Sequence, residues 1–140
     1  MDTYDPQKIS FIIAGNIISG FGEGSFITVA RDEDTWLSVV GTDGRVARAR
    51  NANKKGIVRF TLLQTSPSND VCSSLHNADE LTGVPPGAFQ IVDQLGRTVQ
   101  AGDECFFLKP ADIEFDKQVV GREWTLVVPK LEGVVGGNGL

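Results

Sequence analysis

Short apolar runs that alternate with period two, divided by glycine-rich turns, constrain the fold of this chain most. The clearest run, residues 57–65, places Val58, Phe60 and Leu62 on one face, as expected for a strand with one buried side. The sixteen glycines suit the tight turns between such strands. Similar runs predict strands over residues 8–14, 25–31, 35–40, 45–50, 88–92, 98–101, 105–108, 112–116 and 123–128. We therefore expect a mostly β protein, with hairpin turns at residues 15–16 and 41–44.

One amphipathic helix is predicted over about residues 67–81. Ser66 offers a side-chain cap, and Pro67 suits the first helical position, where its missing N–H costs nothing. Val71, Leu75 and Ala78 recur at helical spacing, so we expect this face to pack on the β core. Together the elements indicate the α+β class, with one helix flanking many strands.

The length predicts a single domain over residues 1–140, with extensions at about residues 1–7 and at the glycine-rich residues 133–140. We expect the second extension to fray or to dock on a neighbour. Cys72 and Cys105 lie far apart without metal-type spacing, so both are expected to be buried and free. Neither a signal peptide nor a membrane anchor is indicated, and synthesis in a cytoplasm is expected.

A basic segment stands out in a chain whose net charge is −5. Its cations are Arg45, Arg48, Arg50, Lys54, Lys55 and Arg59, with no carboxylate among them. It is compatible with a solvated loop, with nucleic-acid binding or with a subunit contact. The acidic balance and the lack of interleaved aromatic residues disfavour nucleic acid, so we favour a subunit contact, with the acidic run Asp32, Glu33 and Asp34 as a complementary surface.

Three acids alternate with two apolar residues near the C-terminal end. On the predicted strand, Asp112, Glu114 and Asp116 share one face, and Ile113 and Phe115 share the other, toward the core. The acidic face is then either a solvated surface or a stripe that lines a lumen. A metal site is disfavoured, because the loop glycine and distant bidentate acid of a calcium-binding hand are missing.

Nothing in the sequence predicts an active site. His76 is the single histidine, lies mid-helix and has no evident nucleophile to activate. The glycine loop of residues 20–24 is followed by a strand, whereas a dinucleotide-binding loop opens a helix. We therefore expect no enzyme, no cofactor and no metal, and the choice lies between a structural subunit and a small β-rich binding module.

Seven segments together resemble the tail tube proteins of contractile-tailed bacteriophages. They are residues 18–21, 26–29, 31–34, 61–71, 78–83, 110–115 and 122–126, so the resemblance spans nearly the whole chain. It implies a small β barrel or sandwich with one flanking helix, similar to the tube proteins of type VI secretion.

The resemblance also implies an assembly. Six copies would close into a ring, and the rings would stack into a hollow tube in the virion, assembled in the host cytoplasm. The implied partners are tail sheath, baseplate and terminator proteins, and DNA would pass through the lumen without specific binding. A baseplate or other virion component without tube-forming ability is the alternative.

Overall fold

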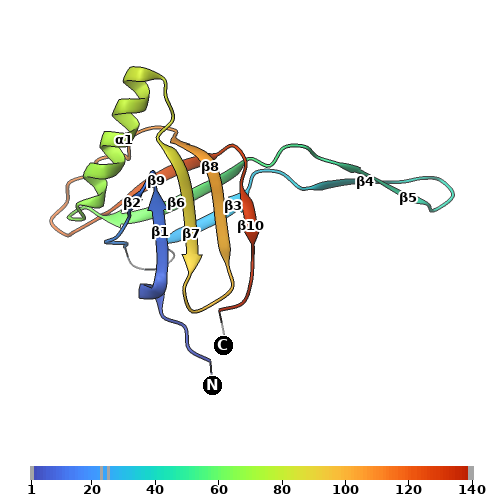
Figure 1. Cartoon of the computed structure of the whole chain (residues 1–140), viewed down its shortest axis with the longest axis horizontal. Coiled ribbons are helices and arrows are strands. Elements are labelled where there is room, and N and C mark those ends of the chain that lie inside the picture. Colours follow the sequence, from blue (N-terminus) through green and yellow to red (C-terminus); the bar gives the residue numbers. More distant parts are fainter. Residues whose placement is uncertain (1, 23, 25, 139–140) are drawn as a thin grey trace.

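Ten strands and one α-helix form the chain in a computed structural model that describes residues 2–22, 24 and 26–138 (Figure 1). A short 3-10 helix, Pro6–Lys8, precedes the first strand. The strands are β1 (Ile9–Ile13), β2 (Asn16–Ile17), β3 (Ile27–Arg31), β4 (Trp36–Val40), β5 (Val46–Arg50), β6 (Gly56–Leu63), β7 (Gly87–Asp93), β8 (Val99–Phe107), β9 (Gly121–Val128) and β10 (Glu132–Val134). The expected mostly β class with one α-helix, α1 (Ser68–Thr82), is confirmed.

Eight strands make one antiparallel sheet in the order β2-β1-β7-β8-β9-β6-β3, with β10 added to β8. The sheet folds over along β8, whose first residues pair with β7 and β10 and whose last residues pair with β9. Gly102 lies at this fold, where a Cβ would come within 2.2 Å of Val128 Cγ1. The result is a curled open sheet and not a closed barrel, with β2 and β3 at its two ends. This body is all of the chain except the β4–β5 hairpin.

Aromatic side chains fill the space between the two halves of the folded sheet. Phe11 lies edge-on to Phe60 and Phe89, with ring centroids 4.9 and 5.7 Å apart, and Phe107 lies 5.4 Å from Trp124. These five residues come from five strands, β1, β6, β7, β8 and β9. Each is buried on the inner face of its strand, as the period-two pattern predicts. The core stabilises the body mainly by removing apolar area from water.

Helix α1 begins on a polar network that ties it to the sheet. The Ser66 hydroxyl donates to the Ser19 carbonyl oxygen at 2.7 Å and accepts from the Ser68 N–H at 3.2 Å. Asn69 accepts a 2.9 Å hydrogen bond from the buried Trp124 indole N–H. The helix ends at Gly83, whose φ of 71° is the left-handed conformation that glycine adopts most easily.

The core-facing side of the helix is shifted toward its N-terminal half. Val71 and Leu75 pack against the core cluster, and Cys72 is buried within it. Ala78, predicted on the same face, is exposed. The last turn of the helix therefore rises away from the sheet, as the helix drawn above the strands in Figure 1 shows.

Two expectations about the C-terminal part are wrong. Residues 112–116 do not form a strand, and Ile113 and Phe115 are exposed rather than buried in the core. The glycine-rich end does not fray over its described part but docks on its own chain. After β10 pairs with β8, the Gly136 carbonyl accepts from the Thr98 hydroxyl at 2.8 Å, and the Gly137 carbonyl accepts from the Arg97 N–H at 2.9 Å.

Candidate assembly surfaces

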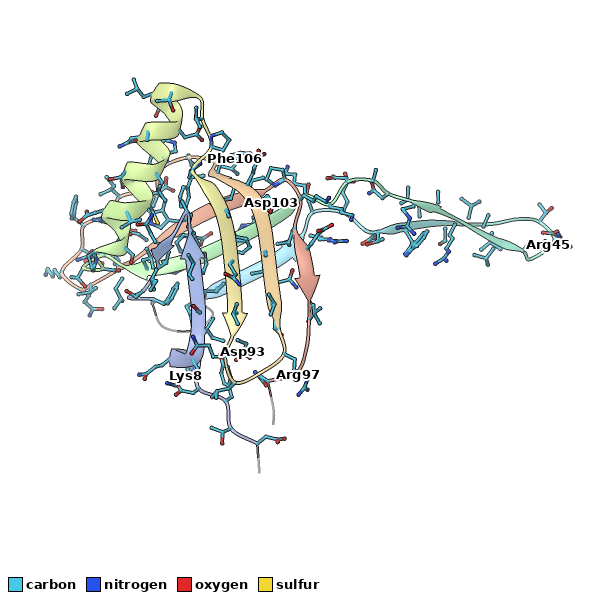
Figure 2. All side chains as sticks on the ribbon, in the orientation of Figure 1. Lys8, Arg45, Asp93, Arg97, Asp103 and Phe106 are labelled. Carbon is cyan, nitrogen blue, oxygen red and sulfur yellow. The ribbon has the colours of Figure 1, made fainter. Side chains whose placement is uncertain are left out.

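Strands β4 and β5 form a hairpin that extends away from the body, and we call Trp36–Arg50 the arm (Figure 1). Every residue of both strands is exposed. Figure 2 shows Arg45 at the far tip, with side chains leaving the ribbon on both sides. An isolated two-stranded hairpin is at best marginally stable in water. Packing on another surface would supply the stabilisation that the body does not.

The register divides the arm into two chemically different faces. Trp36 lies opposite Arg50, and Ser38 lies opposite Arg48, so these side chains share the face that we call basic. The Arg48 guanidinium carbon lies 3.8 Å from the centroid of the Trp36 ring, and that of Arg50 lies at 4.9 Å. The stacking holds both cations in place without neutralising them.

On the opposite face of the arm, the side chains of the two paired strands are all apolar. It consists of Leu37 opposite Ala49 and Val39 opposite Ala47. Leu37 is 60% exposed and Val39 is 70% exposed. Contiguous exposed apolar side chains of this kind mark interaction surfaces in soluble proteins.

The base of the arm is held by ionic and polar contacts within the chain. Lys54 contacts Glu132 at 2.9 Å and Lys55 contacts Asp32 at 3.7 Å. The Lys54 hydrogen bond, with Lys130 nearby, lowers the pKa of the Glu132 carboxyl. Hydrogen bonds from Asn51 and Asn53 lower the pKa of Glu33, and the Asn51 amide also donates to the Asp34 carbonyl oxygen at 3.1 Å.

The predicted basic and acidic segments therefore meet inside one subunit at the arm base. This pairing engages Lys54 and Lys55, whereas Arg45, Arg48 and Arg50 lie along the arm itself. Asp32 and Lys55 lie on either side of the hairpin, and its strand pairing brings them together. The predicted hairpin was therefore the sequence signal from which this ion pair could be expected. The alternation of residues in the sequence also indicates the two faces of the arm. It does not indicate that the arm extends away from the body.

Residues 108–120 form a loop that leaves large apolar groups in solvent. Phe115 is 82% exposed and Ile113 is 69% exposed. Lys109 contacts Asp112 at 3.3 Å, and Glu114 and Asp116 are also exposed. A lumen position for the three acids is expected only from a strand whose other face lies on the core, and residues 112–116 do not form such a strand.

The sheet ends in a strand whose outer edge is free. Strand β3 pairs with β6 on one side and is the last strand of its sheet among the described residues. Two cavities of about 440 and 460 Å³ lie beside it and share Val29 and Ile91. A free edge next to apolar cavities is a surface on which a further strand can be added.

The polar groups offer little chemistry. Cys72 and Cys105 are buried and free, as predicted, and burial raises the pKa of Cys72 to about 12 and that of Cys105 to about 11. Within the described part of the chain, no three His, Cys, Asp or Glu residues are grouped to hold a metal ion. Over the same residues, no helix has the length and apolar character needed to cross a bilayer.

Comparisons with known proteins identify a relative by sequence and two proteins of similar fold. The chain is 31% identical over 144 residues to Structural protein ORF10 of Pseudomonas phage KPP10, covering 97% of this chain and 83% of that protein. Its fold is similar to the anti-feeding prophage tube terminating cap, with a TM-score of 0.63, 9% identity and coverage of 94% and 91% of the two chains. It is also similar to the PVC sheath/tube terminator of an extracellular contractile injection system in its extended state, with a TM-score of 0.64, 10% identity and coverage of 95% and 97%.

The family comparison decides the class of protein. Residues 2–136 match the family described as Bacteriophage PhiTE tail tube protein. The expectation of a structural protein and not an enzyme is confirmed by this match. The chain belongs to the PhiTE tail tube protein family and is a structural protein of a phage tail.

Proposed function

We propose that this chain is the repeating subunit of a tail tube, in which six copies close into a ring and rings stack into a hollow conduit for DNA. The arm is the observation that carries the proposal. Its apolar face has no partner among the described residues of its own chain, so a neighbouring copy would complete it. The family match to tail tube proteins supports the same assembly.

Two kinds of surface would serve two kinds of contact. The free edge of β3 suits lateral pairing with an edge strand of the next copy in a ring, which would remove the hazard of an unpaired edge. The arm suits contact between rings, because it extends well beyond the body (Figure 1). A one-way stack needs two different complementary surfaces on each subunit, and an arm with a separate receiving surface meets that need.

The proposed partners follow from a position inside the tail. Sheath subunits would surround the tube, and baseplate and terminator proteins would bind its ends, with assembly in the host cytoplasm. DNA would pass without specific binding, since the net charge of −5 disfavours adsorption of a polyanion.

Electron microscopy of the purified chain at high concentration tests this function. We expect tubes or stacked rings from the wild-type chain, and dispersed folded subunits from Leu37→Asp with Val39→Asp, because two charges on the apolar face prevent its burial. Circular dichroism should be unchanged in the variant. A wild-type chain that stays monomeric in analytical ultracentrifugation at every salt and concentration would contradict the proposal and favour a binding module.

A tube-ending component is the second candidate. Its support is that both similar solved structures are described as tube terminators. Single rings that never elongate, but that cap tubes formed by another subunit, would favour this role over the tube itself.

A further inference from the structure

Residues 112–116 have the sequence pattern of a β-strand, but among the described residues no strand pairs with them. Acids at 112, 114 and 116 alternate with Ile113 and Phe115, and this period of two is typical of a strand with two different faces. Among the described residues, no backbone–backbone hydrogen bond reaches residues 109–119. A loop of this length without secondary structure is uncommon in a compact protein and usually has a function.

The arm has a matching free edge. Strand β5 pairs with β4 on one side, and its other edge has no strand beside it among the described residues. Along that edge, Arg48 belongs to the basic face, whereas Ala47 and Ala49 belong to the apolar face next to Leu37 and Val39. The two alanines leave room for larger neighbours.

We propose that residues 112–116 of one copy add as a strand to the outer edge of β5 in a second copy. The inference rests on the proposed function and names the surface that receives the arm. A strand added to an edge keeps the same alternation of faces. Ile113 and Phe115 then cover Ala47 and Ala49 on the apolar face. On the other face, two of the three carboxylates lie beside Arg48 and Arg50, and the third lies beside Val46.

The placement of the two segments excludes the same contact within one subunit. In the β6–β9 pair, Gly56 lies opposite Val128 and Leu63 lies opposite Gly121. The arm leads into the Gly56 end, and the 108–120 loop leads into the Gly121 end. With about 3.3 Å per residue, these ends are about 23 Å apart, and Figure 1 shows the arm pointing away from the loop.

Charge supports a second copy as the partner. The arm holds three arginines and one aspartate, a net charge of +2, so the rest of a chain whose total is −5 holds −7. The arm of one copy is thus attracted to the body of another. Contact between opposite ends of successive copies is head-to-tail, the type of contact that builds rings or open stacks.

Charge reversal in two separate preparations tests the contact. One preparation carries Arg48→Glu with Arg50→Glu, and the other carries Asp112→Lys with Glu114→Lys. Each alone juxtaposes like charges, and we expect its critical concentration for assembly to rise about tenfold. In a one-to-one mixture, every contact between the two different variants again joins opposite charges, so assembly with the variants alternating should return toward the wild-type level. All four side chains lie outside the core, and circular dichroism checks that both preparations are folded.

Disulfide formation provides the second measurement, because Cβ atoms of neighbouring strands are about 4.5–5.5 Å apart. Subunits with Ala47→Cys or Ala49→Cys are mixed with subunits carrying Phe115→Cys, and oxidation should link the two chains in one of the mixtures. Leu81→Cys, equally exposed but at the end of α1, is the control and should not link.

The outcomes separate the two proposals. Absence of rings or tubes from the wild-type chain contradicts the proposed function. Wild-type tubes, together with charge-reversed mixtures that do not recover and cysteine pairs that link no better than the control, overturn this contact alone. A tube map with Asp112 and Glu114 in the bore, away from every arm, also overturns it.

Discussion

The two tryptophans show how differently the body and the arm are held. Trp124 is 2% exposed, lies against Phe107 and donates its indole N–H to Asn69. Trp36 is 38% exposed, and the guanidinium groups of Arg48 and Arg50 lie over its ring. Trp124 is buried in the core of the body, whereas Trp36 is presented at the surface of the arm. Stability should therefore reside in the body, and association should reside in the arm.

The largest expected difference comes from one substitution made in both regions. Leu62→Ala in the body should lower the free energy of unfolding by about 2–5 kcal/mol, because Leu62 is fully buried. Leu37→Ala in the arm should change it by less than about 0.5 kcal/mol but should reduce assembly. Urea unfolding and sedimentation measure the two effects. A comparable loss of stability from both variants would mean that the arm is part of the folding unit.

The helix offers a smaller version of the same comparison. Leu75 is partly buried against the core and Leu81 is exposed. Leu75→Ala should therefore cost about 1–2 kcal/mol, and Leu81→Ala should cost almost nothing. Thermal unfolding measures both, and equal melting temperatures for the two variants would show that α1 is not held by its Leu75 face.

Alkaline pH should weaken the body through its buried thiols. Burial raises the pKa of Cys72 from 9.0 to about 12, so the unfolded chain loses this proton first as the pH rises above 9. The stabilisation is complete below pH 9 and is lost progressively toward pH 12, by about 1 kcal/mol between pH 9 and 10. Urea midpoints at pH 8, 9 and 10 measure the slope. Cys72→Ala should have a shallower slope, and an unchanged slope would exclude this thiol as the cause.

The smallest effect is expected at the junction between the two regions. The Lys54 and Lys55 ion pairs are exposed to solvent, so each contributes little to stability. Lys54→Glu with Lys55→Glu should spare the body, speed amide exchange in β4 and β5, and weaken polymerisation. Hydrogen exchange and tube length distributions measure these changes. Unaltered exchange and tube lengths would show that the base does not orient the arm.

The sequence predicted the elements better than their partners. The four-residue turn at 41–44 identified the two strands of the arm. Alternation identified the buried face of β6, because periodicity records which sides of a strand differ. The same signal at residues 112–116 predicted a core-facing strand that the isolated chain lacks. Period-two alternation does not indicate whether the surface that packs on the apolar face belongs to the same chain or to another. The sequence also did not predict the ion pairs at the arm base. The basic and acidic segments were expected on two separate surfaces, whereas the hairpin brings Asp32 and Lys55 together in one chain.

The docked C-terminal strand limits which neighbours the subunit can accept. By pairing with Val99–Ala101, β10 occupies an edge of β8 that the fold of the sheet would otherwise leave open. Gly133 makes this fit possible, because a Cβ there would come within 1.9 Å of the Val99 carbonyl oxygen. This three-residue strand thus prevents a strand of another subunit from pairing with that edge of β8. A shortened chain that lacked β10 would expose an unpaired strand edge, and non-specific association through that edge would compete with ordered assembly.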